Sequence, residues 1–441
     1  MPTITPQIVT LNTQVQIAPS VSQLQQSGAI VSTGGTTLAA GASLYCGNLA
    51  AVTAILSAPL AITSLAWLAG VVTATVPVDL ELAVGQTFTT MISGAAPAGY
   101  NGTFVATVAT PTTFTYSLAT NPGTETTPGT YTPNNAAFVN DAATTFFAQG
   151  TAVLGVSVLE LGPVTSASNA ITALQAWITA NASPQQFYAY LIPPSWDANA
   201  AATLNTVTKN YSSPTSKTYF FVTTTTSNVA LYAANKAVIA LAPSPTQAST
   251  EEQTAQAFYQ WLVNNPGPAN VLAPMAFRYV YGVTPWPQKG NATPIQSVLS
   301  AYGNLILTGA QGGINEAILV NGTTMDGSQA AFWYGVDYFQ IQVAQALAGA
   351  IIDGSNTQPP LLYNQAGINT LQAIAEQIAS NAVAYGCAQS VTVNAIPFTT
   401  YVAANPTDYA NGIYNGFSAT LTGQSGFLTI TFNLTAVAFP T

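Results

Sequence analysis

The sequence predicts an α/β (α+β) core with mixed sheets and flanking helices, interrupted by an inserted all-β domain and extended by β arms at both termini. Three features of the chain support this fold class. Strand and helix signals alternate through its middle, residues 60–132 are rich in Thr, Val, Gly and Pro without helical periodicity, and both termini alternate apolar and polar residues. Alternating elements are typical of layered α/β proteins, whereas short strands without helices indicate an all-β unit.

The chain is almost uncharged. Of its 441 residues, 5 are Lys or Arg and 14 are Asp or Glu, so 4% are charged and the formal net charge is −9. Globular proteins usually carry about 25% charged residues. A hydrophobic content of 49% nevertheless predicts a folded chain. Because so few cations are available to neutralise phosphates, we expect no nucleic-acid partner, and the small net charge permits copies to associate.

The residue types of most catalytic and metal sites are scarce. Histidine is absent, and the two cysteines, Cys46 and Cys387, are far apart and more typical of free buried thiols than of a disulfide. We therefore predict no metal, no cofactor and no enzyme activity. Residues 49–72 are apolar enough to be considered as a membrane span, but Pro59 and several Thr and Ser residues interrupt them. We expect a buried soluble segment there and no membrane insertion.

Residues 1–28 form the predicted N-terminal β arm. They alternate apolar and polar side chains, with Ile8, Leu11 and Val15 among the apolar ones, and no tight turn introduces a neighbouring strand. An arm that pairs with another chain and a first strand that pairs inside its own domain are equally compatible with this pattern. We expect no signal peptide, because the first residues lack a basic region.

Residues 60–132 are predicted to form an inserted β-sandwich. Short β-like runs at 66–75, 87–92, 103–109 and 112–118 alternate with turn signals such as Asn101-Gly102. The GYNGTF segment at 99–104 and the TTFTY segment at 112–116 resemble the immunoglobulin-like β modules that decorate phage structural proteins. Without the insertion, residues 29–59 and 133–410 join into one discontinuous α/β core. An insertion in a surface loop adds little closure entropy, so this arrangement is physically accessible.

The core is predicted from alternating strands and amphipathic helices. Helices are expected at 136–149, 168–180 and 229–234, and another follows a cap at Thr250. Strands are expected at 152–159, 186–192, 218–222 and 237–241. This order of elements predicts a sheet that is largely buried between helices.

The last third contains two predicted long helices and terminal strands. Residues 336–352 repeat apolar side chains at i, i+4 spacing, with Asp337 near the helix start and Gly354 as its stop. Residues 368–385 carry an apolar seam at heptad spacing, and strands are expected at 391–396 and 417–422. Residues 411–441 are assigned to C-terminal β strands or an arm, whose apolar positions include Phe427, Ile430 and Phe432 and whose aromatic residues are expected to be buried.

A motif before the first long helix carries a family resemblance. It combines a Gly-Thr-x-x-Asp-Gly turn, a tryptophan and an Asp-x-x-Gln helix start, formed here by Gly322, Thr323, Asp326, Gly327, Trp333, Asp337 and Gln340. With this motif and the two helices that follow, the core outside the insertion resembles the tail sheath-like proteins of contractile-tailed phages. Residues 188–197 fit the same family more loosely.

The resemblance implies a structural virion protein. Its relatives form stacked hexameric rings around a tail tube, terminal arms add strands to the sheets of neighbouring sheath subunits, and contraction drives tube ejection. The implied partners are further copies of the chain, the tail tube protein, and the baseplate and tail terminator proteins, with assembly in the host cytoplasm. The family usually carries more charge, so its ionic contacts with the tube are not transferred to this chain.

The residues alone indicate the same class of function. A β arm satisfies its backbone groups only by pairing, and two arms at opposite ends of one chain can build a polymer. Three other interpretations stay open: a glycosidase carboxylate pair of Asp326 and Asp337 beside Trp333, an adhesin that binds through the inserted domain, and a self-assembling surface array. A turn residue at Asp326 and a helix-start residue at Asp337 explain the two carboxylates more simply.

Overall fold

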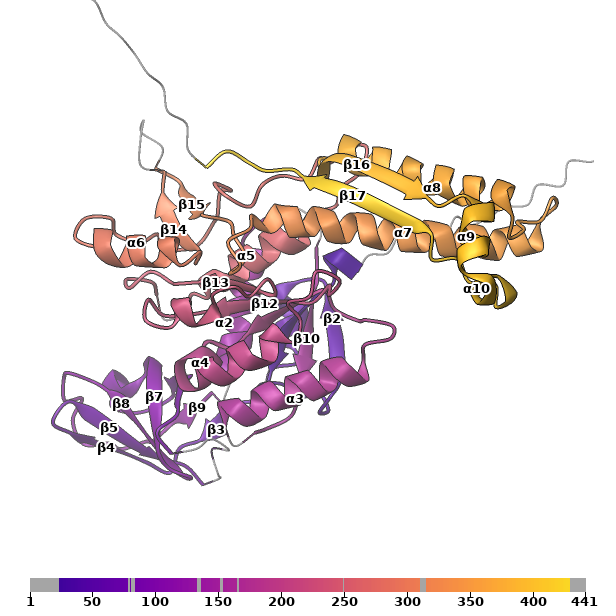
Figure 1. Cartoon of the computed structure of the whole chain (residues 1–441). Helices are drawn as coiled ribbons and strands as arrows, with labels where there is room; N and C mark the ends of the chain where they lie inside the picture. The colour runs from indigo at the N-terminus through magenta and orange to yellow at the C-terminus, as the bar shows by residue number, and fades with distance from the viewer. Residues whose placement is uncertain are drawn as a thin grey trace, which may run out of the picture.

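The computed structural model describes residues 24–77, 80, 84–132, 136–150, 154–164, 166–248, 250–309 and 315–428. These residues form a layered α/β core, an antiparallel sheet at one end and a long helical layer at the other (Figure 1). The purple strands of the insertion and the orange and yellow C-terminal elements lie on opposite sides of the core in this view. The prediction of a mixed α/β core is therefore confirmed.

A six-stranded sheet forms the centre of the core. Its strands follow the order β13-β12-β11-β1-β10-β2, and all are parallel except β2 at one edge. The strands are β1 (Gly28–Ser32), β2 (Ser43–Cys46), β10 (Val156–Glu160), β11 (Ala189–Ile192), β12 (Tyr219–Thr223) and β13 (Val238–Leu241). Every residue of the five parallel strands is buried, as expected of a parallel sheet that is covered on both faces.

Helices cover both faces of this sheet. They are α1 (Leu49–Thr53), α2 (Ala136–Phe147), α3 (Ala167–Ala180), α4 (Pro194–Lys209) and α5 (Gln253–Leu262). The neighbours Phe220 and Phe221 of β12 point to opposite faces: Phe221 packs with α2 and α5, and Phe220 packs with α3 and α4. The core therefore consists of two hydrophobic clusters separated by the sheet.

Residues 24–28, predicted as the end of the N-terminal arm, pack within the core. Residues 24–26 form the short 3-10 helix η1 (Leu24–Gln26), and β1 lies in the middle of the sheet. Gln25 is buried, and its amide donates to the Tyr334 carbonyl oxygen at 3.0 Å. A Cβ at Gly28 would lie 2.5 Å from a side-chain carbon of Leu262, so glycine allows β1 to approach α5 closely. Residues 24–28 thus belong to the core.

Two helix starts differ from the predictions. The Glu252 carboxylate caps α5, because it accepts a hydrogen bond from the Thr254 N–H at 3.3 Å and another from the Thr223 hydroxyl; the predicted cap at Thr250 is wrong. Thr223 of β12 thus holds the capping carboxylate in place. α4 begins at Pro194, where a loop was expected, because the fixed φ of proline suits the first position of a helix.

The strands of the insertion form one antiparallel sheet in the order β3-β9-β6-β7-β8-β5-β4. They are β3 (Leu60–Ala61), β4 (Ser64–Leu68), β5 (Val71–Thr75), β6 (Thr87–Ser93), β7 (Gly102–Thr110), β8 (Thr113–Ser117) and β9 (Thr130–Tyr131), with the 3-10 helix η2 (Ala98–Tyr100) before β7. Phe88, Phe114 and Tyr116 belong to a hydrophobic cluster separate from those of the core. The immunoglobulin-like sandwich is not confirmed, because the hydrogen bonds join all seven strands into one continuous sheet.

One strand predicted in the insertion is in fact a hairpin. Residues 66–75 were expected to form a single strand, but β4 and β5 pair antiparallel around a two-residue turn. Ala69 and Gly70 both have positive φ, of 49° and 88°. Such a turn matches the twist of the two strands and reverses the chain within an apolar run.

Removal of residues 60–131 is expected to leave the core folded. Leu60 pairs with Tyr131, so the two ends of the insertion are neighbours, and a short Gly-Ser linker can join Pro59 to Thr132. The shortened chain exposes the parts of α2 and α4 that contact β6, at a cost of about 1–2 kcal/mol in the free energy of unfolding. Urea unfolding followed by circular dichroism measures this difference. Loss of cooperative unfolding would instead show that the insertion is integral to the core.

The remaining elements complete the core and build the C-terminal layer. They are η3 (Val229–Tyr232), α6 (Ala292–Ser300), the hairpin of β14 (Leu305–Thr308) and β15 (Ala317–Val320), α7 (Ala330–Asn356), α8 (Gln365–Ala384), β16 (Ala388–Ala395), α9 (Phe398–Ala404), α10 (Pro406–Ala410) and β17 (Phe417–Gly423). α7 starts in the core and projects from it beside α8 (Figure 1).

The first long helix extends beyond its predicted bounds of 336–352 at both ends. α7 runs through Gly354, which was expected to stop it. A Cβ at Gly354 would lie 2.4 Å from the Cβ of Leu361, so this glycine makes room for the chain that returns toward α8. Among the described residues, no helix combines the length and apolar character of a membrane span. Residues 49–72, considered as a span from the sequence, form a short helix and β strands instead.

Candidate assembly surface and its helical anchor

A two-stranded sheet, here called the outer sheet, covers α7 and α8. It consists of β16 and β17, paired antiparallel from Ala388–Gly423 to Ala395–Phe417. One face of it packs inward through Val391, Val393 and Leu421. The helices thus position the outer sheet at the molecular periphery, away from the six-stranded sheet (Figure 1).

The opposite face of the outer sheet is polar and uncharged. Its cross-strand pairs are Ser390–Thr422, Thr392–Thr420 and Asn394–Ser418, and all six of these residues are exposed. Such a face can be covered by a partner without desolvating an ion, which is the expensive step in burying charged groups.

Both edges of the outer sheet are open. The sheet has two strands, so within the described residues each strand pairs on one side only. A strand edge presents unpaired N–H and C=O groups that can accept a further strand from another chain. The outer sheet therefore has the geometry of a strand acceptor with two sites.

The first half of α7 fixes this layer to the core through a buried polar cluster, here called the α7 anchor: Tyr188, Tyr219, Lys236, Asp326, Trp333 and Asp337. Asp337 is fully buried on α7. Its Oδ2 accepts hydrogen bonds from the hydroxyls of Tyr188, at 2.8 Å, and Tyr219, at 2.7 Å. Hydrogen bonds to a charged acceptor are stronger than neutral ones, so this contact ties α7 firmly to the sheet.

Lys236 occupies the other side of the anchor. It is 3% exposed, and its ammonium group lies 4.6 Å from the ring centre of Trp333 and 5.2 Å from that of Tyr219. The ammonium donates to the carbonyl oxygens of Ser213 and Ser216. The cation therefore combines hydrogen bonds with attraction to two aromatic faces.

The ionisation of the anchor reflects its burial. Desolvation raises the pKa of Asp337 to about 6, although the charge of Lys236 and the hydrogen bonds from Tyr219 and Tyr188 act in the opposite direction. Desolvation lowers the pKa of Lys236, and attraction to Asp337 opposes this shift. The charge of the anchor thus changes in mildly acidic solution, where an exposed aspartate stays ionised.

The predicted glycine-threonine motif forms the turn that leads into α7. Gly322 has a φ of +65°, and a Cβ there would lie 2.4 Å from the Ala276 nitrogen. The Thr323 N–H donates to the side chain of Asn304, and Gly327 has a φ of +88°. The backbone geometry of this turn therefore requires the two glycines of the motif.

Asp326 joins this turn to the α7 anchor. Its Oδ2 accepts a hydrogen bond from Trp333 Nε1 at 2.9 Å, and its Oδ1 accepts from the hydroxyl of Thr324 and the N–H of Ser328. The structure thus joins Asp326 to Trp333, and Lys236 lies beside both Trp333 and Asp337. The carboxylate of Asp326 closes the turn and orients the indole over Lys236.

Two interpretations of the motif need correction. Asp337 is not a helix-start residue, because α7 begins at Ala330 and Asp337 lies about two turns inside it. The glycosidase interpretation also fails, since the carboxylate of Asp337 is fully enclosed and bound to two tyrosines. Gln340 lies at the surface, where its amide donates to the Pro214 carbonyl at 3.4 Å.

Most residues predicted in the two arms lie outside the described part of the chain: Ile8, Leu11, Val15, Ile430 and Phe432.

Phe427, which is described, is 81% exposed, so its predicted burial is wrong for the single chain. The neighbouring Gly426 is held by the side chain of Gln329, which donates to its carbonyl at 2.9 Å and accepts from its N–H at 2.7 Å. The chain after β17 therefore leaves from a fixed point beside the start of α7.

Sequence reasoning missed three members of the α7 anchor. Tyr188 and Tyr219 belong to apolar segments at the starts of β11 and β12, and Lys236 lies two residues before β13. The available signal was the rarity of lysine: one of only 5 basic residues of the chain stands beside a buried strand, which indicates a cation with a specific partner. Cys46 and Cys387 are both buried and free. The described residues contain no cluster of three side chains able to hold a metal ion.

Comparison with known proteins gives a structural likeness without a sequence family. No family model and no curated protein matches the sequence. A chain in the cryo-EM structure of the anti-feeding prophage baseplate matches with a TM-score of 0.54 and 10% identity, over 98% of this chain and 99% of that one. The two chains share their overall fold along nearly their whole length.

Two sheath tail proteins are also similar, at lower scores. The protein from Desulfitobacterium hafniense matches with a TM-score of 0.41 and 12% identity, over 88% of this chain and 93% of that one. The protein from Listeria innocua matches with a TM-score of 0.44 and 11% identity, over 90% of this chain and 95% of that one.

Proposed function

We propose that the protein is a structural subunit of a contractile tail, in which copies form stacked hexameric rings around a tail tube and drive its ejection on contraction. The observation that carries this proposal is the shared fold, along almost the whole chain, with a component of the anti-feeding prophage baseplate structure. The partners would be neighbouring copies, the tube, and the baseplate and tail terminator proteins. The site of action is the virion tail, assembled in the host cytoplasm, and no catalysis is involved.

The proposed polymerisation works by strand exchange. The arms of neighbouring copies, including Ile8, Leu11 and Val15 at one end and Phe427, Ile430 and Phe432 at the other, would add strands to the two open edges of the outer sheet. Main-chain hydrogen bonds would hold the copies together without any need for charged side chains. Because the α7 anchor joins the outer sheet to the core, movement of the core would be transmitted along α7 to this network.

A proline in β17 tests the acceptor edge. The Ile396 N–H donates to the Gly416 carbonyl, so these two residues form a hydrogen-bonded pair. Hydrogen-bonded and non-hydrogen-bonded pairs alternate along an antiparallel ladder, so Ala419 belongs to a non-hydrogen-bonded pair and its N–H points to the free edge. Ala419→Pro removes this donor without breaking the β16–β17 ladder. Loss of one interchain hydrogen bond, about 1–1.5 kcal/mol, should raise the protein concentration needed for assembly about 10-fold. Light scattering and negative-stain microscopy measure assembly.

The matched control is Ala419→Val. It keeps the N–H and favours a strand, so it should assemble like the parent chain. Circular dichroism verifies that both variants are folded. Equal assembly of the proline and valine variants would contradict strand addition at β17.

A further inference from the structure

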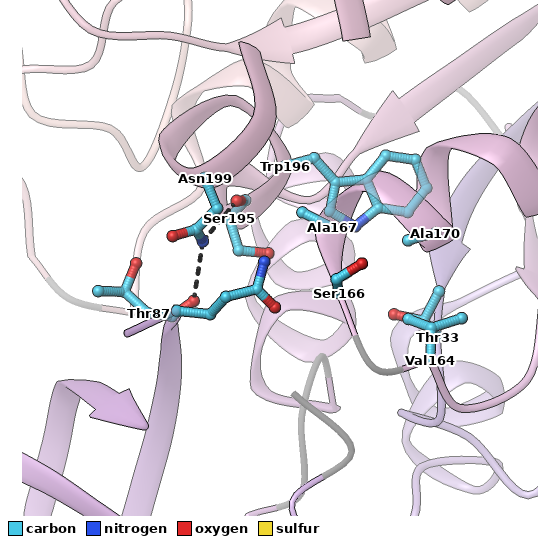
Figure 2. A pocket seen from close by; sticks show the side chains of 10 residues that line it. Thr33, Thr87, Val164, Ser166, Ala167, Ala170, Ser195, Trp196 and Asn199 are labelled. Carbon is cyan, nitrogen blue, oxygen red and sulfur yellow. Dashed lines mark hydrogen bonds between the residues drawn. The ribbon is translucent and has the colours of Figure 1, made fainter. Parts of the chain in front are cut away.

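The inserted sheet meets the core along β6. This strand contacts α2 and α4. At the junction, Asn199 Nδ2 donates to the Thr87 carbonyl at a long 3.4 Å, while its bond to the Ser195 carbonyl within α4 is 2.8 Å (Figure 2). The chain enters and leaves the insertion at the paired strands β3 and β9, so both connections lie side by side. This arrangement permits rotation of the insertion as a body about one narrow connection.

A cleft of about 310 Å³ separates the insertion from the core at this junction. Thr87 and Thr89 of β6 and Val105 of β7 form one wall. The other wall is built by α2, α4, the end of β12 and the segment before α5. The cleft therefore lies at the carboxyl ends of parallel strands, where helices and loops leave the sheet.

All charged side chains among the described residues that line the cleft are acidic. Asp141 of α2, Asp197 of α4, and Glu251 and Glu252 before α5 line it, and no lysine or arginine is among its described lining residues. The strands β6 and β7 bring only uncharged side chains to it. The core wall thus contributes four carboxyl groups, of which Asp197, Glu251 and Glu252 also accept hydrogen bonds within the core.

We propose that this junction is a pH-sensitive hinge, in which the insertion closes over the cleft in acid and separates from it when the carboxyl groups of the cleft ionise. In the closed state a carboxylate would be partly shielded from water and surrounded by like charges. Separation rehydrates the carboxylates and increases their distance from the uncharged strand face. This hinge is independent of the proposed tail function, because it concerns a single chain.

The protonation of the closed cleft follows from burial. Desolvation raises the pKa of Asp141 to about 6 and that of Glu252 to about 7; repulsion from Asp141 adds to the shift of Glu252, and hydrogen bonds from Thr223 and Thr254 oppose it. Desolvation also raises the pKa of Asp197 against its hydrogen bonds from Tyr232, Asn228 and Thr224. Closure is therefore favoured at low pH and is lost as the pH rises through these values.

The expected change in the equilibrium constant for opening of the cleft can be calculated from Asp141 alone. If separation returns its pKa from about 6 to the ordinary 3.8, the equilibrium constant for opening rises about 10-fold between pH 5 and pH 8. Ionisation of Glu252 over the same interval increases the constant further. The change is thus large enough to convert a mostly closed population into a mostly open one.

Small-angle X-ray scattering of the unassembled full-length chain at pH 5 and pH 8 tests the hinge. We expect a larger radius of gyration at pH 8. Hydrogen exchange, corrected for its intrinsic pH dependence, should be faster at pH 8 in peptides that cover residues 86–91 and 195–199. The variant Asp141→Asn/Glu252→Gln should show a much smaller difference between the two pH values, because Asp197 is then the one described carboxyl group of the cleft with a raised pKa.

Two further variants separate a hinge from a general pH effect. Glu376→Gln changes an exposed carboxylate on α8 and should keep the response of the parent chain. Asp141→Asn alone, which leaves the Glu252 cap of α5 intact, should reduce the opening response about 10-fold and remains informative if the double variant does not fold. The proposal is overturned if the parent chain has the same dimensions and exchange at both pH values, or if Asp141→Asn responds like the parent.

Discussion

A chain that begins at residue 24 is expected to fold normally and to form no long assemblies. Every strand and helix described in the core starts at residue 24 or later, so the deletion leaves both hydrophobic clusters complete. Under the proposed function it removes the donor strand that joins copies, and strand addition contributes several main-chain hydrogen bonds at once. Sedimentation velocity should therefore show polymers for the parent chain and slowly sedimenting monomers or small oligomers for the deletion.

The position of the cut is decisive in this experiment. A deletion through residue 28 would remove Gln25, which bonds to Tyr334, and part of β1 at the centre of the sheet. Such a chain would fail to assemble because its core is damaged. The matched control is the chain without residues 60–131, which keeps its arms and should still polymerise. Polymers of unchanged length from the chain that begins at residue 24 would refute the N-terminal arm as the donor.

The core of the fold could be predicted because its signals are local. The strands β11, β12 and β13 are buried along their whole length, and such strands appear in a sequence as largely continuous apolar runs. The composition of residues 60–132 likewise indicated an all-β unit. Its continuous sheet could not be predicted, because the pairing of β5 with β8 and of β6 with β9 depends on contacts between distant segments.

The errors at helix ends have a common physical cause. Asp337 and Gly354 have the usual chemistry of a helix start and a helix stop, yet both lie inside α7. Their positions are set by tertiary contacts: Asp337 binds Tyr188 and Tyr219, which are 149 and 118 residues away, and Gly354 makes room for Leu361. The sequence motif locates the turn before α7, but it does not contain these partners.

Replacing Asp337 by alanine is expected to destabilise the protein by about 3–5 kcal/mol. The substitution leaves the hydroxyls of Tyr188 and Tyr219 without their buried acceptor and deprives Lys236 of the nearby negative charge. The loss should appear as a lower midpoint in urea unfolding, and hydrogen exchange in the first half of α7 should accelerate. Assembly should weaken as well, because α7 carries the outer sheet.

Asp337→Asn is the informative control, since it keeps an acceptor oxygen at the same place without the charge. Below about pH 3 the parent carboxyl group is protonated in both the folded and the unfolded chain, so the two proteins should differ little. As the pH rises from about 4 to about 6, the unfolded chain ionises at Asp337 while the buried carboxyl group resists ionisation, and the parent should lose about 3 kcal/mol relative to the asparagine variant. Parallel stability curves for the two proteins between pH 3 and pH 7 would show that Asp337 is not a buried titrating group, and the anchor would then stabilise α7 through packing alone.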